Sequence, residues 1–113
     1  MEQHYKLFRV RELADGDEEF INILAQTFLE EVPADAEVLK ESVESNNHLA
    51  TYQVAHKMKP TIDMFELGVL ADLIEVQDWG KLEKKGVDIT PKLQIVLAAV
   101  KQASDEIRSD FNL

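Results

Sequence analysis

Cysteine is absent from this chain of 113 residues, which excludes disulfide bonds, thiolate catalysis and zinc sites with cysteine ligands. The glycines are only four and scattered, so the chain has neither a Gly-x-Gly-x-x-Gly motif nor a phosphate-binding P-loop. No apolar run approaches the ~18 residues of a membrane span, and the start of the chain does not resemble a signal peptide. We therefore expect a cytoplasmic protein that does not enter a membrane and has no ATP-dependent kinase activity of its own.

Positive charge is also scarce. Twelve lysines and arginines stand against 22 acidic residues, and the formal net charge is −10 at pH 7. An acidic surface repels phosphate backbones and anionic lipids, so nucleic acid and membrane surfaces are not expected as partners. The length suits one domain over residues 1–113, large enough for a single hydrophobic core.

Hydrophobic residues recur at helical spacing along the chain, with no strand-like alternation and no internal repeat. Four substantial helices with short connections, preceded by a short one, predict an all-α fold: an antiparallel four-helix bundle with a short additional N-terminal helix. The aromatic side chains of Phe20, Phe28, Phe65 and Trp79 are expected in its core. The predicted helices run from about Tyr5 to Ala14, from Asp17 to Val43 with a kink or interruption at Pro33, from Asn47 to a bend at Gly68, from Leu70 to about Lys84, and from Thr90 to Ile107.

Local signals mark several of the helix ends. Asp17 and Asn47 are N-cap residue types directly before hydrophobic stripes. Lys84-Lys85-Gly86 is a C-terminal signal for the fourth helix, because cations complement the helix dipole and glycine accepts positive φ. Thr90 and Pro91 suit the N-cap and first position of the last helix.

The third helix carries a histidine on its outer side. At ~100° per residue, His56 lies far from the centre of the apolar arc and points to solvent, with Tyr52, Lys59 and Asp63 on the same side. The apolar arc consists of Ala50, Val54, Met58, Ile62 and Phe65.

The charge around this histidine differs from that of the rest of the chain. No acidic residue occurs between Glu44 and Asp63, and the formal charges in that interval are Lys57 and Lys59. An imidazole with an ordinary pKa near ~6.5 is largely deprotonated at pH 7 and offers a nucleophilic nitrogen. Lys59, one turn from His56, is placed to neutralise an anion received by that nitrogen, as phosphoryl transfer requires. The alternative is an ordinary exposed histidine beside solvated surface lysines.

A metal centre is a less suitable interpretation of the histidines. Di-iron helical bundles use Glu-x-x-His, but the residues three positions before the histidines are Met1, Ser45 and Gln53. His48 and His56 are eight residues apart, which is about 12 Å along a helix and too far for one ion. We therefore expect no metal or cofactor bound by this chain itself.

The string Ala55-His56-Lys57-Met58-Lys59-Pro60 resembles the active-site signature of histidine-containing phosphotransfer (HPt) domains, Ala-His-x-hydrophobic-Lys-Gly. The upstream segment from Leu13 to Phe20, followed by Phe28, Leu29 and Pro33, resembles the beginning of the same family. The similarity spans most of the chain.

This resemblance implies a phosphorelay carrier. His56 would be the phosphorylated residue, expected at Nε2, and Lys59 would contact the phosphoryl group. The partners would be receiver domains of response regulators or hybrid kinases, which supply both the aspartyl phosphate and the Mg²⁺. We expect the carrier to be a monomer. Its docking surface around His56 would comprise Tyr52, Gln53, Lys57, Pro60, Asp63 and Met64, with an adjoining apolar strip of the second helix.

Two positions depart from the family pattern. Pro60 replaces the usual glycine four residues after the histidine, and Asp63 replaces a small residue. Proline removes a helical N–H donor and predicts a local kink. Asp63 would either place a negative charge near the incoming phosphoryl group or pair with Lys59 at i,i+4. Both changes bear on partner choice and transfer rate.

Two other functions fit the same residues. A degenerate relative would dock on receivers without phosphoryl transfer, and Pro60 and Asp63 favour it. A phosphohistidine domain excised from beside a kinase would look similar, although the initiating methionine favours a stand-alone protein.

Overall fold

The computed structural model describes residues 5–113, and all regular structure in that range is helical. The predicted all-α class is confirmed, and no strand occurs in this part of the chain. Five helices follow one another: α1 (Phe8–Leu13), α2 (Glu18–Glu44), α3 (His48–Met64), α4 (Leu70–Lys81) and α5 (Thr90–Asp110).

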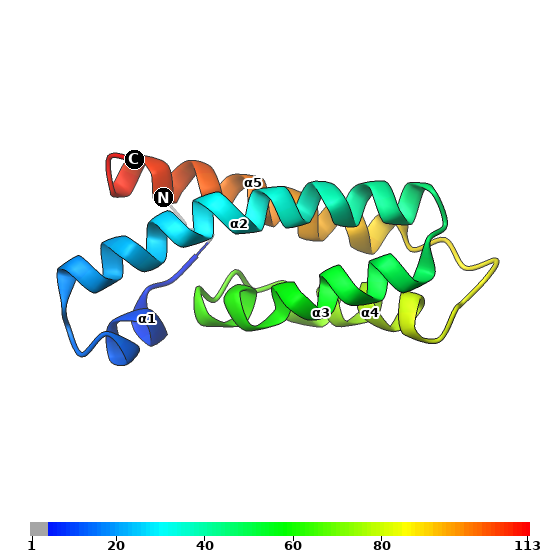
Figure 1. Ribbon diagram of the computed structural model, residues 1–113, viewed down its shortest axis with the longest axis horizontal. Helices are drawn as coiled ribbons and strands as arrows, with labels where there is room; N and C mark the ends of the chain where they lie inside the picture. Colours follow the sequence, from blue (N-terminus) through cyan, green and yellow to red (C-terminus); the bar gives the residue numbers. More distant parts are fainter. Residues whose placement is uncertain (1–4) are drawn as a thin grey trace.

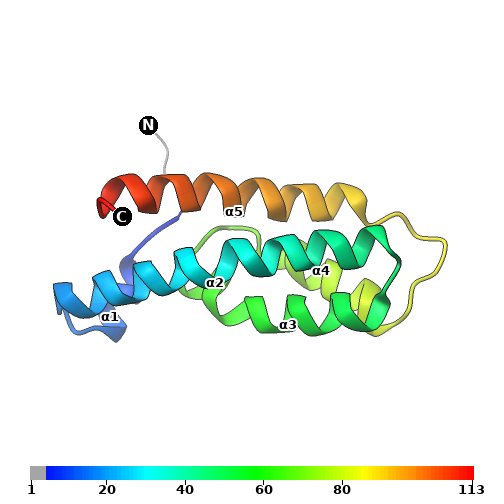
Figure 2. The ribbon, with the colours of Figure 1, turned by 45° about the horizontal axis from the view of Figure 1, so that its top comes forward.

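The four longer helices pack in a closed ring. α2 contacts α3 and α5, and α4 contacts the same two helices from the other side. Figure 1 shows that consecutive helices run in opposite directions, and that α1 lies beyond the end of the ring, beside the start of α2. Turning the molecule in Figure 2 separates α5 from the α3 and α4 pair. The largest fully buried side chains inside the ring include Ile21, Phe28, Leu39, Met58, Ile62, Phe65, Leu73, Leu93 and Ile107.

The two predicted N-caps at the start of α2 and α3 are confirmed. The Asp17 carboxylate accepts hydrogen bonds from the backbone N–H groups of Glu19 and Phe20, at 3.0 and 3.3 Å. The Asn47 side chain accepts from Ala50 N–H at 3.1 Å. Each acceptor satisfies donors that the first helical turn leaves unpaired, which fixes where the helix begins.

A kink or an interruption was predicted at Pro33, and the interruption does not occur, because α2 is continuous from Glu18 to Glu44. Figure 1 shows the ribbon of α2 changing direction near its middle without breaking. A proline inside a helix removes one hydrogen bond, and neighbouring turns and tertiary contacts preserve the rest of the ladder.

The first helix is shorter than predicted. α1 begins at Phe8, and the preceding Tyr5 is buried at 2% exposure outside any helix. The Tyr5 hydroxyl donates a 2.6 Å hydrogen bond to Asp110 Oδ2, which ties the N-terminal segment to the end of α5. On α1 itself, Phe8 and Leu13 are 68% and 62% exposed. A helix of six residues contacts only the beginning of α2, so most of its surface stays uncovered.

Stability is expected to fall in alkaline solution through Tyr5. Burial first, and then the hydrogen bond and charge of Asp110, raise the pKa of the Tyr5 hydroxyl above its usual value. The folded state therefore holds this proton more tightly than the unfolded chain does. The resulting stability is fully present below pH ~10 and is lost as the pH rises above it.

Urea denaturation at neutral and strongly alkaline pH, with Tyr5→Phe beside the wild type, checks this expectation. The difference in unfolding free energy between the two proteins should shrink as the pH rises, because Phe has no proton to lose. A difference independent of pH would contradict the assignment.

The ends of α4 and α5 also differ from prediction. α4 ends at Lys81, and the predicted signal Lys84-Lys85-Gly86 lies in the following loop. The Trp79 Nε1–H donates to the Val87 carbonyl at 2.9 Å and holds this loop against the helix. At the start of α5, the Asp88 carboxylate accepts from Thr90 N–H at 3.0 Å. Asp88 therefore provides the side-chain acceptor that was predicted to come from Thr90.

Three of the four aromatic side chains predicted in the core are buried. The rings of Phe28 and Phe65 pack with centroids 4.8 Å apart, and Trp79 is also buried. Phe20 is 39% exposed, so its placement in the core is wrong. Across residues 5–113, none of the helices combines the length and apolar composition needed to cross a bilayer.

Candidate functional site

α3 turns position 56 outward. Its inner face consists of the buried residues Thr51, Val54, Ala55, Met58 and Ile62. The Thr51 hydroxyl also forms a hydrogen bond with the Ser42 hydroxyl of α2, with the two oxygens 2.9 Å apart. This bond fixes the rotation of α3 against its neighbour. His56 is exposed on the opposite face, as the helical spacing predicts.

The imidazole of His56 has one aromatic neighbour. The Tyr52 ring lies one turn earlier, with centroids 5.8 Å apart and the ring planes tilted by 36°. Within residues 5–113, His56 makes no hydrogen bond and no ion pair. Tyr52 is half-buried and limits the rotamers open to the histidine, while the ring nitrogens keep their hydrogen-bonding capacity for an external group.

The two lysines beside His56 have different surroundings. Lys57 Nζ is 3.0 Å from Asp35 Oδ1 on α2, and this hydrogen bond raises the pKa of Lys57. Lys59 is half-buried and has no ion pair in the described part of the chain. Lys57 is therefore directed toward α2. Lys59 lies one turn from His56, where no carboxylate of residues 5–113 pairs with it.

Asp63 does not pair with Lys59, so that predicted alternative is wrong. Its Oδ1 lies 2.7 Å from Nη1 of Arg9 on α1, and Arg9 Nε is 3.9 Å from Glu66. The Lys6 N–H also donates to the Phe65 carbonyl at 2.8 Å, which holds the segment before α1 at the end of α3. Arg9 thus compensates the negative charge that the sequence placed beside the site.

Arg9 is the residue of this site that sequence reasoning missed. It lies 54 positions from Asp63 in the chain (63 − 9 = 54). No spacing rule connects residues on separate helices at such a distance. No signal in the sequence indicated this pair, because a half-exposed arginine can be solvated by water without a carboxylate partner.

The remaining docking residues predicted on α3 divide by exposure. Gln53 and Pro60 are exposed, whereas Met64 is half-buried and packs against the core. α3 continues through Pro60 to Met64, although proline provides no N–H for the His56 carbonyl. On α2, the exposed apolar side chain near Asp35 is Val38, so the predicted apolar strip is short there.

The arrangement suits chemistry at a nitrogen nucleophile. It combines an exposed imidazole, an unpaired ammonium one turn away and a carboxylate already neutralised by arginine. Comparisons with protein-family models, with curated proteins and with solved structures find no match for this chain. We therefore base the functional proposal on these residues.

The backbones of α3 and α4 approach each other closely at Gly80. A Cβ atom at Gly80 would lie 2.5 Å from the His48 carbonyl oxygen and 2.7 Å from the Tyr52 nitrogen. Only glycine lets the two backbones come so near. The His48 ring stacks on Trp79, with centroids 4.1 Å apart, so this histidine serves the packing of the two helices. Sequence reasoning assigned no role to Gly80.

Among residues 5–113, no three His, Asp or Glu side chains lie close enough together to hold a metal ion. A shallow cavity of about 290 Å³ adjoins Tyr52 on the side of α4. It is lined by Leu49, Tyr52, Gly80, Lys81 and Glu83.

Proposed function

We propose that this chain is an HPt domain that carries phosphoryl groups between receiver domains. The observation that carries the proposal is the exposed imidazole of His56, which has no hydrogen-bond or ion-pair partner among residues 5–113. Lys59, also without an ion pair in this range, lies one turn away. The resemblance of the segment around His56 to the HPt signature adds support. The closed ring of α2 to α5 supports an antiparallel four-helix bundle, with α1 as the additional short helix. We place this carrier in the cytoplasm, where receiver domains work.

The transfer step uses the partner's phosphate and metal. In its neutral form with the proton on Nδ1, His56 has a free electron pair on Nε2. This nitrogen attacks the phosphorus of the receiver's aspartyl phosphate in line. The bond between phosphorus and the aspartyl oxygen breaks, and the carboxylate leaves with the electron pair while remaining near the receiver's Mg²⁺. Lys59 neutralises charge on the transferred group, and the reverse reaction delivers it to a second receiver.

The direct test is a transfer assay with the purified chain. Receivers phosphorylated by acetyl phosphate are mixed with it in the presence of Mg²⁺. We expect label on the chain that is stable in alkali and lost in acid, as phosphohistidine requires, and that passes to a second, unlabelled receiver. Receivers that bind the chain without ever labelling it would overturn the carrier function.

The second candidate function is a docking module without phosphoryl chemistry. Pro60 favours it, because an exposed proline ring occupies the surface beside His56 where the family's glycine lets a partner approach. In that case His56→Gln would leave both receiver binding and downstream output intact. Reverting Pro60→Gly would then be expected to restore labelling in a chain that otherwise only binds.

Lys59→Ala is expected to slow labelling by about tenfold, since removing one charged hydrogen-bond donor from a phosphate costs roughly 1.5 kcal/mol. The half-buried Lys59 is the ammonium available to the phosphoryl group. Lys92→Ala is the matched control, because Lys92 lies on α5 and pairs with Asp72 and Glu75 of α4. Rapid-quench time courses of both variants should show the loss only for Lys59. Equal rates in the two variants would rule out the assigned role.

Arg9→Ala is expected to slow transfer about two- to fourfold, because one unit charge ~10 Å away in water acts on a dianion with under ~1 kcal/mol. The variant exposes the charge of Asp63, which lies two turns beyond His56. Asp63→Asn in the same chain should restore the rate. The effect should also shrink at high salt, where the screening length falls below the separation.

A different outcome is expected if α1 acts only through packing. The double variant would then remain as slow as Arg9→Ala, and salt would not change the ratio of the rates.

A further inference from the structure

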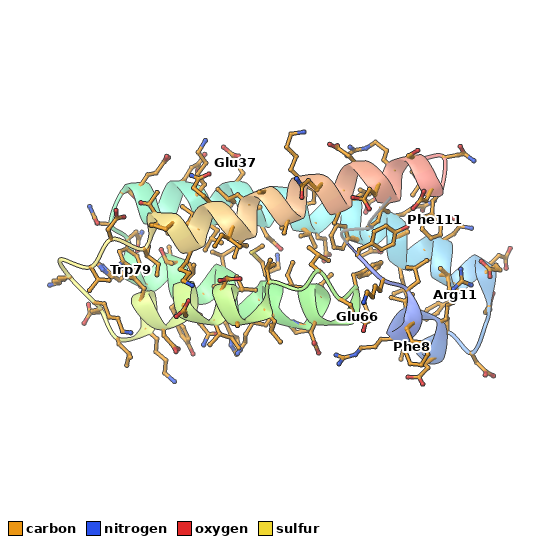
Figure 3. The ribbon with its side chains drawn as sticks, turned by 180° about the vertical axis from the view of Figure 1, so that it is seen from behind. Phe8, Arg11, Glu37, Glu66, Trp79 and Phe111 are labelled. Atoms are coloured by element: carbon orange, nitrogen blue, oxygen red, sulfur yellow. The ribbon has the colours of Figure 1, made fainter. Side chains whose placement is uncertain are left out.

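A second polar cavity lies between α2 and α5 and shares no residue with the His56 site. Its volume is about 370 Å³, in the range of small-molecule pockets. Figure 3 views the molecule from behind and labels Glu37 on the side where α2 lies along α5. The cavity is lined by Pro33, Ala36, Glu37 and Lys40 of α2 and by Leu97, Val100, Lys101, Ser104, Asp105 and Arg108 of α5.

The net charge of the residues lining this cavity is opposite in sign to the net charge of the chain. Three cations and two carboxylates line it, a local balance of +1 (3 − 2) in a protein of net charge −10. Asp105 is shared, at 3.1 Å from Lys101 and 3.5 Å from Arg108. Lys40 has no ion pair among the described residues and is half-buried. The cavity therefore has cationic groups that its own carboxylates do not fully neutralise.

Ser104 adds an independent observation at this cavity. The residue is 4% exposed, and its Oγ is buried without a hydrogen-bond partner among residues 5–113. A buried hydroxyl without a partner costs roughly 1–3 kcal/mol, so native proteins rarely keep one. Ser104 lines the cavity together with Val100 and Arg108.

We propose that this cavity binds a small organic oxyanion, a carboxylate or phosphate ester with a short apolar body. Lys40 and Arg108 would attract the charged group, and the Ser104 hydroxyl would donate a hydrogen bond to one of its oxygens. The apolar body would lie against the wall formed by Pro33, Ala36, Leu97 and Val100. Because the cavity belongs to α2 and α5, such a ligand and a partner docked on α3 can bind together.

NMR titration of the full chain tests this proposal, with hexanoate, acetate, hexyl phosphate and hexylamine as probes. Hexanoate should shift backbone amides of residues 33–40 and 97–108, and it should bind at least ~tenfold more tightly than acetate because of its buried methylenes. Comparing hexanoate with hexyl phosphate distinguishes the two head groups. Hexylamine, with the opposite charge, should leave these amides unchanged.

Three variants sharpen the test. Lys40→Gln is expected to weaken hexanoate binding about tenfold. Lys92→Gln makes the same charge change on α5, where Lys92 pairs with Asp72 and Glu75 of α4, and should not affect binding. Ser104→Ala should weaken binding without destabilising the free protein, since it removes a hydroxyl that lacks a partner. Equal weakening by Lys40→Gln and Lys92→Gln, or shifts spread over the whole surface, would overturn the proposal.

Discussion

Replacing His56 with glutamine is expected to abolish phosphoryl acceptance completely and to leave the fold intact. Glutamine keeps a polar, helix-compatible side chain but has no nucleophilic nitrogen. His56 is exposed, and its ring lies beside that of Tyr52, with centroids 5.8 Å apart. Surface substitutions of this kind change the free energy of unfolding by no more than ~0.5 kcal/mol. Labelling by a phosphorylated receiver and a urea melt of the same sample measure both effects.

His48→Gln is the matched control for this prediction. It makes the same chemical change on the same helix, at a histidine stacked against Trp79. This variant should accept the phosphoryl group at close to the wild-type rate while losing some stability. Label that persists in His56→Gln and disappears in His48→Gln would contradict the assignment of the site.

Gly80→Ala is expected to destabilise the protein by about 1–3 kcal/mol, the cost typical of forcing an extra carbon into a packed region. The new Cβ would lie 2.5 and 2.7 Å from backbone atoms of His48 and Tyr52, so α3 and α4 must separate. Because Tyr52 lies beside His56, the displaced helix should also slow labelling. Chemical denaturation and the transfer assay check the two effects.

The sign of the change makes this prediction sharp. Ala is favoured over Gly inside a helix by about 1 kcal/mol, so propensity alone would make Gly80→Ala stabilising. Ala71→Gly, at an exposed position of the same helix, measures that propensity term without any new contact. A stabilised Gly80→Ala protein would show that the helices are not in close contact at this point.

Features set by neighbouring residues were predictable from the sequence. The outward position of His56 follows from helical periodicity, and the caps at Asp17 and Asn47 follow from side chains that reach their own first turn. The all-helical class follows from the same periodicity along the chain. In each case the determining contacts lie within a few residues, where spacing rules apply.

Features set by tertiary contacts were not predictable. The ion pair between Arg9 and Asp63, and the hydrogen bond between Tyr5 and Asp110, join segments far apart in the chain. The close approach at Gly80 depends on which face of α4 meets α3, and a lone glycine in a helix gives no sign of that. Helical spacing likewise does not predict that the side chain of Phe8 stays exposed.

The measurement that tests the central claim most directly is NMR of the imidazole nitrogens while a phosphorylated receiver and Mg²⁺ are added to the ¹⁵N-labelled chain. We predict that the Nε2 resonance of His56 shifts and gains a coupling to phosphorus, while the resonances of His48 stay in place. A complex that forms without any phosphorus coupling, or a coupling that appears on a residue other than His56, would contradict the proposed function.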